Sequence, residues 1–281
     1  MALRDSELFD RLDRFYDAVP RDLARAEQIG GLVLFVRDGA GRPFYARPRR
    51  DADQPPSAAD ITSARARQRD LDVPESFEWI HENHPDLLAV ARSAGLSVLE
   101  APLMVLDPDA LPAADALADL PVRLVDPAAA DFDHDIALAA AVAGIGFGAP
   151  GTATGQAGPT ERDAALRHPD TAQATRERER AAAGRKITVL AGSPTEGVLA
   201  SGAAQRVGDV AEIVAVATLP SARRRGLGAA VTAALARRLR DTGTDLIFLS
   251  ADNDEVARVY LRVGFRRVGT ACIAEPTPAP L

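Results

Sequence analysis

The sequence predicts an α/β protein of two domains, and three observations carry that prediction. Short apolar runs typical of buried strands alternate with helix-like segments, as over 210–219, 229–240 and 246–250. A turn with two glycines joins the first of these strands to the helix after it. Asp, Pro and Ala dominate residues 107–121, a composition typical of a boundary. A chain of 281 residues is also long enough for two modest cores.

The first half opens with apolar residues at helical spacing, which predict a helix over residues 1–28. The next elements are predicted as a strand over 31–37, a hairpin turn at 38–41, a second strand over 43–46, a loop or irregular helix over 47–69, and a strand over 77–81. A helix over 85–94 then ends at Gly95, and one or two strands follow over 97–106, interrupted at Pro102.

After the boundary, the predicted order alternates strands and helices to the end of the chain. It runs as strand 122–125, helix 133–143, loop 144–158, one or two solvated helices over 160–183, strands 186–191, 197–203 and 210–219, helix 226–240, strand 246–250, helix 255–263 and strand 265–273. The tail, residues 275–281, is too rich in proline to be predicted as a strand.

The composition favours a globular protein of the cytoplasm. Hydrophobic content of 47% and charged content of 26% are ordinary for such proteins. A net charge of −7 argues against a nucleic-acid partner, and the lone Cys272 excludes an intramolecular disulfide or a multi-cysteine metal site. The first residues are too charged for a secretory signal, and no charge-free apolar run reaches about 18 residues, so we expect no membrane span.

The segment that carries most information follows the apolar run that ends at Leu219. It reads Arg223-Arg224-Arg225-Gly226-Leu227-Gly228-Ala229 and opens the helix-like run that follows. A strand, a glycine turn and a helix direct several backbone N–H groups to one place, where the helix dipole favours a negative charge. The two glycines let a phosphate approach the backbone, and the three arginines offer further contacts. The segment therefore predicts a phosphate cradle, with an ordinary turn that has a solvated basic tip as the alternative.

A second motif lies downstream, from Asn253 to Tyr260, and is followed by Gly264 and Phe265. The two motifs together resemble the signature of GCN5-related N-acetyltransferases (GNAT), whose loop reads Arg/Gln-x-x-Gly-x-Gly/Ala and grips the pyrophosphate of acetyl-CoA. The resemblance covers about 122–274. It implies the acyl-CoA N-acyltransferase fold, a mixed central sheet with helices on both faces. We expect this domain over residues 116–281, after a smaller α/β domain over 1–115. The smaller domain is interpreted as a degenerate GNAT-like copy or as an accessory domain.

The resemblance also implies an activity and assigns residues to it. The expected enzyme is an N-acetyltransferase that moves an acetyl group from acetyl-CoA to an amine by direct attack in a ternary complex. The backbone of Val216, Ala217 and Thr218 would meet the thioester and its pantetheine arm. Tyr260 would give its proton to the departing thiolate. Asn253 would contact the pantetheine arm or would cap the helix that it precedes.

The least defined role is that of the general base. Glu212 lies near the start of the strand over 210–219, where several GNAT proteins place a glutamate. A surface glutamate at a strand edge is an equal alternative. Asp252 or Asp254 would substitute for it, and ordered water alone is a further possibility. For Tyr260 the alternative is a half-buried tyrosine on an amphipathic helix.

Three other patterns are set aside. Residues 146–151 fit Gly-x-Gly-x-x-Gly, but they follow a predicted helix where a dinucleotide site needs a strand. His81 and His84 share a turn without a third ligand nearby, and Pro85 ends that turn, so no metal is expected. The only lysine, Lys186, is outside any Gly-Lys-Ser/Thr setting, which excludes a P-loop.

Two rival functions remain open. One is a non-catalytic acyl-CoA-binding regulatory module, which needs the loop but not Tyr260. The other is an acyltransferase of the same fold that takes an aminoacyl group from charged tRNA, which the acidic charge balance disfavours. The acceptor is left as a small amine, an amino-acid derivative or antibiotic, or a protein N-terminus or lysine. The oligomeric state is also open, with a homodimer as one candidate.

Overall fold

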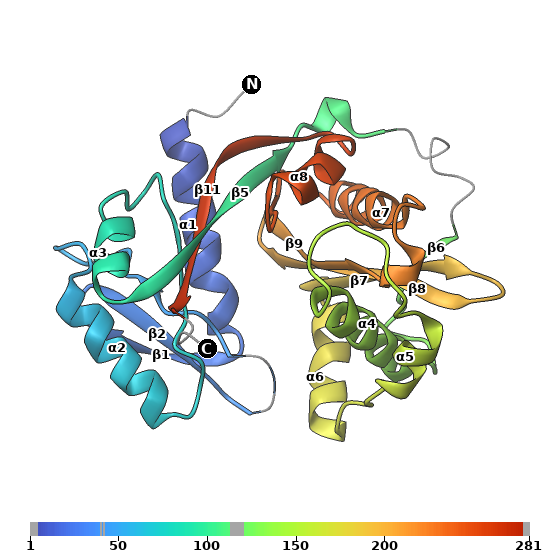
Figure 1. Cartoon of the computed structure of the whole chain (residues 1–281), viewed down its shortest axis with the longest axis horizontal. Helices are drawn as coiled ribbons and strands as arrows, with labels where there is room; N and C mark the ends of the chain where they lie inside the picture. Colours follow the sequence, from blue (N-terminus) through green and yellow to red (C-terminus); the bar gives the residue numbers. More distant parts are fainter. Residues whose placement is uncertain (1–4, 40, 42, 113–120, 278–281) are drawn as a thin grey trace. The chain divides into compact units, whose positions relative to one another are not determined.

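The structure is a computed structural model that describes residues 5–39, 41, 43–112 and 121–277 (Figure 1). Its α-helices are α1 (Asp5–Arg21), α2 (Ala58–Asp70), α3 (Leu87–Ser93), α4 (Phe132–Phe147), α5 (Pro159–Ala164), α6 (Thr171–Ala182), α7 (Leu227–Asp241) and α8 (Asp254–Leu261). Its strands are β1 (Ala24–Ile29), β2 (Leu32–Arg37), β3 (Arg47–Pro48), β4 (Phe77–Ile80), β5 (Leu96–Leu106), β6 (Val122–Leu124), β7 (Lys186–Ser193), β8 (Gly197–Val207), β9 (Val210–Thr218), β10 (Leu246–Ser250) and β11 (Phe265–Pro276).

The chain forms two compact units. Unit 1 comprises Met1–Leu103 and Val268–Leu281, and unit 2 comprises Met104–Arg267. β1, β2 and β3 form a three-stranded sheet, and the other strands form a mixed sheet in the order β4-β11-β5-β10-β9-β8-β7-β6. β5 and β11 belong to both units because the division falls within them. The predicted α/β class with a mixed sheet and flanking helices is therefore confirmed.

In unit 1 the beginning of the chain differs from the prediction. The helix ends at Arg21, and residues 24–29, predicted as helical, form β1. β1 pairs with β2 in antiparallel register, and Gly30 takes a left-handed φ of 54° in the turn between them. The hairpin partner of β2 is thus β1 and not the segment 43–46. Backbone pairing to an adjacent strand overrides the helix propensity of Ala, Glu and Gln in β1.

The segment expected to be a loop or irregular helix contains the regular helix α2. Ser57 and Asp60 form a capping box, in which the Ser57 side chain accepts from the Asp60 N–H and the Asp60 carboxylate accepts from the Ser57 N–H. Asp60 also accepts from the Gly31 N–H at 3.2 Å. Farther along, β5 continues through Pro102 as one strand. The core of unit 1 gathers around Trp79, which is 2% exposed.

Unit 2 is built on the antiparallel meander of β7, β8 and β9, with β10 parallel to β9. Two consecutive residues of β8 show that helices cover both faces. Ser201 donates a hydrogen bond to the Ala139 carbonyl of α4 at 3.1 Å. The next residue, Gly202, faces α7, because a Cβ built on it would lie 2.6 Å from Val231 and 3.2 Å from Leu235. Figure 1 shows α4 and α7 on opposite sides of these strands.

Several predicted boundaries after residue 121 move. α4 extends to Phe147, three residues past the predicted loop start at Gly144, because Gly146 packs directly on β9. A Cβ on Gly146 would lie 2.9 Å from the Cβ of Ala217. The segment over 160–183 forms two helices, α5 and α6. β11 continues through Pro276, so the first two residues of the tail are strand, while residues 278–281 lie outside the described part.

One order of elements occurs twice in the chain. β4, α3 and β5 follow one another as β10, α8 and β11 do. In each copy a glycine with positive φ joins the helix to the last strand, Gly95 at 79° and Gly264 at 99°. The repeat supports the interpretation of a degenerate copy over 77–106, and the tandem arrangement and its boundary at 115/116 stay predictions.

Candidate functional site

The predicted phosphate loop lies between the end of β9 and the start of α7. The short 3-10 helix over Pro220–Ala222 leads into it. Arg224 and Gly226 then take left-handed φ values of 66° and 80°, and α7 begins at Leu227. These two reversals turn successive N–H groups toward the same side of the loop.

After Arg223, the backbone N–H groups of this loop have no recorded acceptors within the described part of the chain. The N–H of Arg223 bonds to the Pro220 carbonyl at 3.4 Å, and the next N–H with a recorded acceptor is that of Ala230, bonded to the Gly226 carbonyl at 3.0 Å. The N–H groups of the six residues between them, 224–229, have no recorded acceptor and lie at the positive end of a 15-residue helix. The local geometry therefore suits an anion.

Gly228 is not required by the packing around it. A Cβ built there would lie 3.6 Å from the Thr218 hydroxyl, an ordinary van der Waals contact. Its φ lies outside the left-handed region. A methyl group would therefore fit the fold at this position, and a bulkier side chain would cover the amides of the loop. This is the arrangement expected where a ligand must reach the main chain.

The three arginines of the motif have different surroundings. The Arg223 guanidinium donates to the carbonyls of Gly146, Ala149 and Ala153, and its burial lowers its pKa. Arg225 pairs with Glu196 at 3.0 Å. Arg224 is exposed and makes no recorded side-chain contact with the described residues. Of the three side chains, that of Arg224 is therefore the one available to a phosphate.

β9 carries a bulge just before the predicted contact residues. Ala203 of β8 pairs with Val214, and Ser201 pairs with Ala217, so three steps on β9 match two on β8. Ala215, within the bulge, has a φ of 55°, which is unusual for a residue with a side chain. The predicted contact residues Val216, Ala217 and Thr218 follow directly.

β9 and β10 pair only at their beginning. Their parallel register runs from Leu246 and Val210 to Phe248 and Glu212, although both strands continue. Beyond Glu212, the edge of β9 has no registered strand partner on that side. Unpaired amides on such an edge can accept an extended ligand as an added strand.

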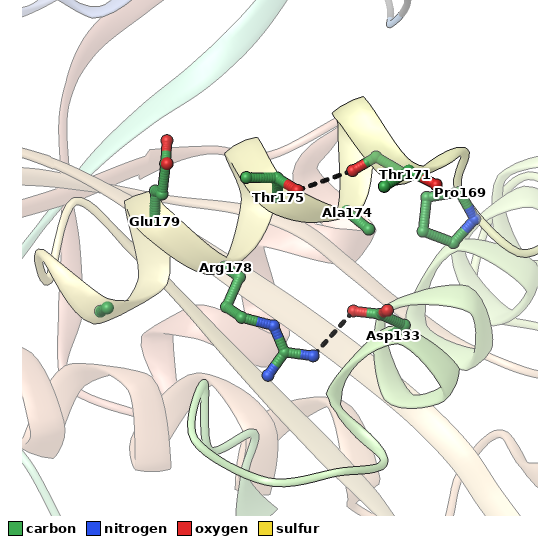
Figure 2. A pocket seen from close by; sticks show the side chains of 8 residues that line it. Asp133, Pro169, Thr171, Ala174, Thr175, Arg178 and Glu179 are labelled. Atoms are coloured by element: carbon green, nitrogen blue, oxygen red, sulfur yellow. Dashed lines mark hydrogen bonds and ion pairs between the residues drawn. The ribbon is translucent and has the colours of Figure 1, made fainter.

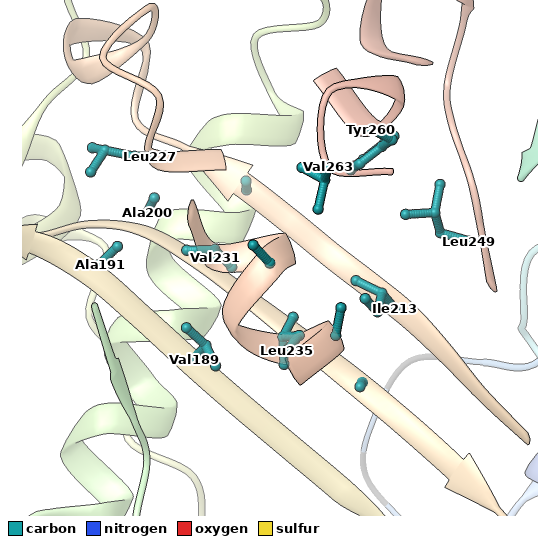
Figure 3. Packing of buried hydrophobic residues seen from close by; sticks show 14 of the residues in the cluster. Val189, Ala191, Ala200, Ile213, Leu227, Val231, Leu235, Leu249, Tyr260 and Val263 are labelled. Atoms are coloured by element: carbon teal, nitrogen blue, oxygen red, sulfur yellow. The ribbon is translucent and has the colours of Figure 1, made fainter. Parts of the chain in front are cut away.

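Tyr260 belongs to the hydrophobic core of unit 2 that includes residues of β9 and β10. It is 7% exposed, and Figure 3 shows it near Val263, above Ile213 of β9 and Leu249 of β10. Its ring meets that of Phe265 edge-on at 6.2 Å between centroids. Its hydroxyl has no recorded hydrogen bond to a described residue. Burial raises the pKa of the phenol to about 12, so the group keeps its proton at neutral pH.

Glu212 is buried and is not at a free strand edge. It is 9% exposed, pairs with Gln205 of β8 on one side, and forms the last pair with Phe248 of β10 on the other. It therefore marks the point where β9 and β10 separate. Its role as a base stays a prediction.

Asn253 caps α8. Its side-chain oxygen accepts from the N–H groups of Glu255 and Val256, each at 3.0 Å, and its amide donates to Asp252 at 2.8 Å. Of its two expected roles, the structure contains the capping role. Asp254 pairs with Arg267 at 3.3 Å on the surface.

Sequence reasoning missed one contact in this region, which the segment after α4 makes with α8. The hydroxyl of Thr152 in that segment donates to Glu255 in the first turn of α8. Because both residues have common surface side chains and lie far apart in sequence, no local pattern identifies the contact. The Gly-x-Gly-x-x-Gly pattern at 146–151 begins within α4, so it lacks the strand that a dinucleotide site needs.

A separate groove of about 370 Å³ lies between α6 and the start of α4. Figure 2 shows Arg178 of α6 directed toward Asp133, with which it pairs at 3.0 Å. The groove is lined by Asp133, Pro169, Thr171, Ala174, Thr175, Arg178, Glu179 and Ala182. None of the predicted site residues lines it, so it is not part of the candidate site.

The described part of the chain contains no group of three or more His, Cys, Asp or Glu side chains arranged to hold a metal ion. In the same residues, no helix has both the length and the apolar character that crossing a bilayer requires.

Comparison with known proteins connects this geometry to a family. Residues 196–273, which include β9, the loop and α8, match the family described as "FR47-like protein". No curated protein matches the sequence.

Solved structures resemble nearly the whole chain. A GCN5-related N-acetyltransferase from Kribbella flavida is 24% identical with a TM-score of 0.65, over 94% of this chain and 95% of that one. A GCN5-related N-acetyltransferase-like protein from Streptococcus suis 89/1591 is 12% identical with a TM-score of 0.54, over 97% and 99%. A tandem GNAT protein from the clavulanic acid biosynthesis pathway is 15% identical with a TM-score of 0.50, over 89% and 79%. At such identities the likeness establishes the fold.

The glycine loop, the bulged strand and the separating neighbour strand thus occur in a chain with the acyl-CoA N-acyltransferase fold, and the resemblance to GCN5-related N-acetyltransferases is confirmed.

Proposed function

We propose that unit 2 is an N-acetyltransferase that moves an acetyl group from acetyl-CoA to an amine. The observation that carries the proposal is the row of unpaired N–H groups over residues 224–229, which lies next to the unpaired edge of β9. The two features match the two parts of the donor, a diphosphate and an extended arm that ends in a thioester. The family match over 196–273 supports the same donor.

The donor loop would hold the diphosphate mainly through main-chain groups. The N–H groups of residues 224–229 would donate to its oxygens, and Arg224 would add a charge from the exposed side. Gly226 provides the left-handed turn, and Gly228 leaves the amides uncovered. Arg225 would contribute through its backbone N–H, since its side chain pairs with Glu196, whereas the Arg223 side chain contacts carbonyls and the Arg223 N–H bonds to Pro220.

The edge of β9 would position and polarise the thioester. Over Val216–Thr218 its free backbone groups would bind the pantetheine arm, and one N–H would stabilise the negative charge that develops on the carbonyl oxygen. The donor supplies an activated acyl group on a good leaving sulfur. The amine nitrogen attacks the carbonyl carbon, a C–N bond forms, and the C–S bond breaks.

Two protons must then move. Tyr260 would donate its phenolic proton to the leaving sulfur; burial raises its pKa to about 12, so the phenol carries that proton at neutral pH. The attacking nitrogen must lose a proton, and Glu212 would accept it directly or through water. Its place where β9 and β10 separate supports this assignment.

The proposal is tested by thiol-release detection with acetyl-CoA across a panel of amines, together with calorimetry of coenzyme A binding. Turnover with at least one amine, lost in Tyr260→Phe while coenzyme A still binds, is the expected result. Binding without turnover for any amine would instead support a non-catalytic acyl-CoA-binding module. Absence of binding would refute both functions. A donor that binds only as aminoacyl-tRNA, with steep salt dependence, would support the tRNA-dependent alternative.

A further inference from the structure

The segment between α4 and α5, residues 148–158, is fastened to the donor loop by Arg223. We call this segment the strap. The Arg223 guanidinium donates to the carbonyls of Gly146 at 2.9 Å, Ala149 at 2.5 Å and Ala153 at 3.0 Å. The Arg223 side chain thus hydrogen-bonds both to the last turn of α4 and to two residues of the strap. Three charge-assisted hydrogen bonds from one fork-shaped group fix a loop far more narrowly than one bond does.

The backbone of the strap also pairs with the segment before Arg223. The Gly155 N–H donates to the Pro220 carbonyl at 3.1 Å, and the Ser221 N–H donates to the Ala157 carbonyl at 3.0 Å. The approach is close enough to require glycines. A Cβ on Gly155 would lie 2.9 Å from Pro220, and one on Gly158 would lie 2.6 Å from the Ser221 hydroxyl. The strap therefore lies directly against residues 220–223.

The other side of the strap reaches the helix that carries Tyr260. Thr152 donates to Glu255, and a Cβ on Gly151 would lie 3.8 Å from the same carboxylate. The strap thus contacts residues 220–223, which follow β9, on one side and the start of α8, the helix that carries Tyr260, on the other. The residues of the strap, 148–158, include no charged side chain.

We propose that Arg223 is a positioning residue that holds the strap, as the acceptor side of the reaction site, in register with the donor loop. The inference rests on the proposed function. The backbone amides of the donor loop would bind the donor diphosphate, and the side chain of its first residue, Arg223, bonds to the strap. Donor binding that orders residues 224–229 therefore also orders the strap, and by linkage an ordered strap strengthens donor binding by the same factor.

The uncharged strap also indicates how the acceptor is held. Its own carbonyl, hydroxyl and amide groups can hydrogen-bond an amine, and the charged group recorded beside them is the Glu255 carboxylate that Thr152 contacts. The proposal is therefore that the acceptor binds against the strap through hydrogen bonds, at a surface whose position Arg223 sets.

The test is amide hydrogen exchange of peptides that cover residues 148–158, with and without saturating coenzyme A. It compares the wild type with Arg223→Gln and Arg223→Lys. The matched control is Arg167→Gln, because the Arg167 guanidinium also binds carbonyls, those of Ala164 and Leu166, without a recorded contact to residues 217–223. Coenzyme A binding is measured on the same samples by calorimetry.

In the wild type and in Arg167→Gln, we expect coenzyme A to slow exchange of the strap at least fivefold. In Arg223→Gln the strap should exchange at the same rate with and without coenzyme A. The affinity for coenzyme A should fall by no more than the factor by which coenzyme A slows strap exchange in the wild type. Arg223→Lys should give an intermediate result, because lysine keeps the charge but cannot span three carbonyls. Once an acceptor is identified, Arg223→Gln should raise its KM more than it lowers kcat.

The outcomes separate the two claims. If the wild type binds coenzyme A and the strap is protected equally in Arg223→Gln, the positioning role is wrong and the proposed function stands. If the wild type does not bind coenzyme A, the proposed function fails and the inference fails with it. If Arg223→Gln does not fold, strap exchange with and without coenzyme A is compared between the wild type and Arg223→Lys instead. If coenzyme A slows strap exchange equally in the two proteins, the proposal is overturned.

Discussion

Replacement of Tyr260 by phenylalanine tests whether Tyr260 acts as a general acid or only packs in the core. Burial raises the pKa of the phenol from 10.0 to about 12. A shift of this size corresponds to about 3 kcal/mol in favour of the protonated form. The hydroxyl has no recorded hydrogen bond to a described residue, and the ring packs against Phe265. Phenylalanine keeps that packing, so the free energy of unfolding at pH 8 should change by less than about 1 kcal/mol.

Turnover should respond much more strongly than stability. Loss of a positioned general acid typically lowers the rate by about 10²- to 10⁴-fold, equivalent to about 3–5 kcal/mol in the activation free energy. The measurement is kcat from thiol release with acetyl-CoA and the best amine of the panel, together with coenzyme A affinity. Turnover within about twofold of the wild type would show that Tyr260 is a packing residue.

Alkaline pH gives a second test that needs no acceptor. Above pH 10 the unfolded chain loses the Tyr260 proton, while the folded chain keeps it until about pH 12. Between these values the folded state binds more protons, so the free energy of unfolding falls as pH rises. At pH 11 the wild type should lose about 1 kcal/mol relative to Tyr260→Phe, as measured by urea unfolding at pH 8 and pH 11. Buried Cys272 titrates in both proteins and cancels in the comparison.

Other variants test the remaining parts of the site. Gly228→Val should keep the thermal midpoint, because a Cβ there makes an ordinary contact 3.6 Å from the Thr218 hydroxyl, yet calorimetry should show at least a tenfold loss of coenzyme A affinity. Gly226→Ala should lower the free energy of unfolding by about 1–2 kcal/mol in urea titrations, since its φ is 80°. Arg224→Gln should weaken coenzyme A binding by about two- to fivefold at low salt and less at high salt, with unchanged stability, as for an exposed charge. Burial raises the pKa of Cys272 to about 12, so a thiol reagent at pH 8 should leave the native chain unmodified and should label one thiol per chain after denaturation.

The sequence predicted the strand, loop and helix around the donor site because glycine position and apolar periodicity are local signals. The bulge at Ala215 illustrates what local signals lack. An alanine with a φ of 55° is held by pairing across β8 and β9, and nothing in its side chain indicates it. Arg223 shows the same limit. Its place in the motif suggested a phosphate contact, but its side-chain partners are carbonyls about 70–77 residues away in sequence.

Errors elsewhere have similar causes. Residues 24–29 have helical propensity but pair with β2, so tertiary pairing decides their conformation. α2 could have been predicted, since Ser57 and Asp60 have the spacing of a capping box, but the neighbouring prolines and charges obscured that signal. The Thr152–Glu255 contact joins residues 103 apart and could not be read from either segment alone.

The most direct test of the whole account is calorimetric titration of coenzyme A into the wild type and into Gly228→Val. The account predicts one site per chain in the wild type and binding at least tenfold weaker in a variant that remains folded. No heat in the wild type, or equal affinity in the two proteins, would contradict the claim that the amides of residues 224–229 hold the donor.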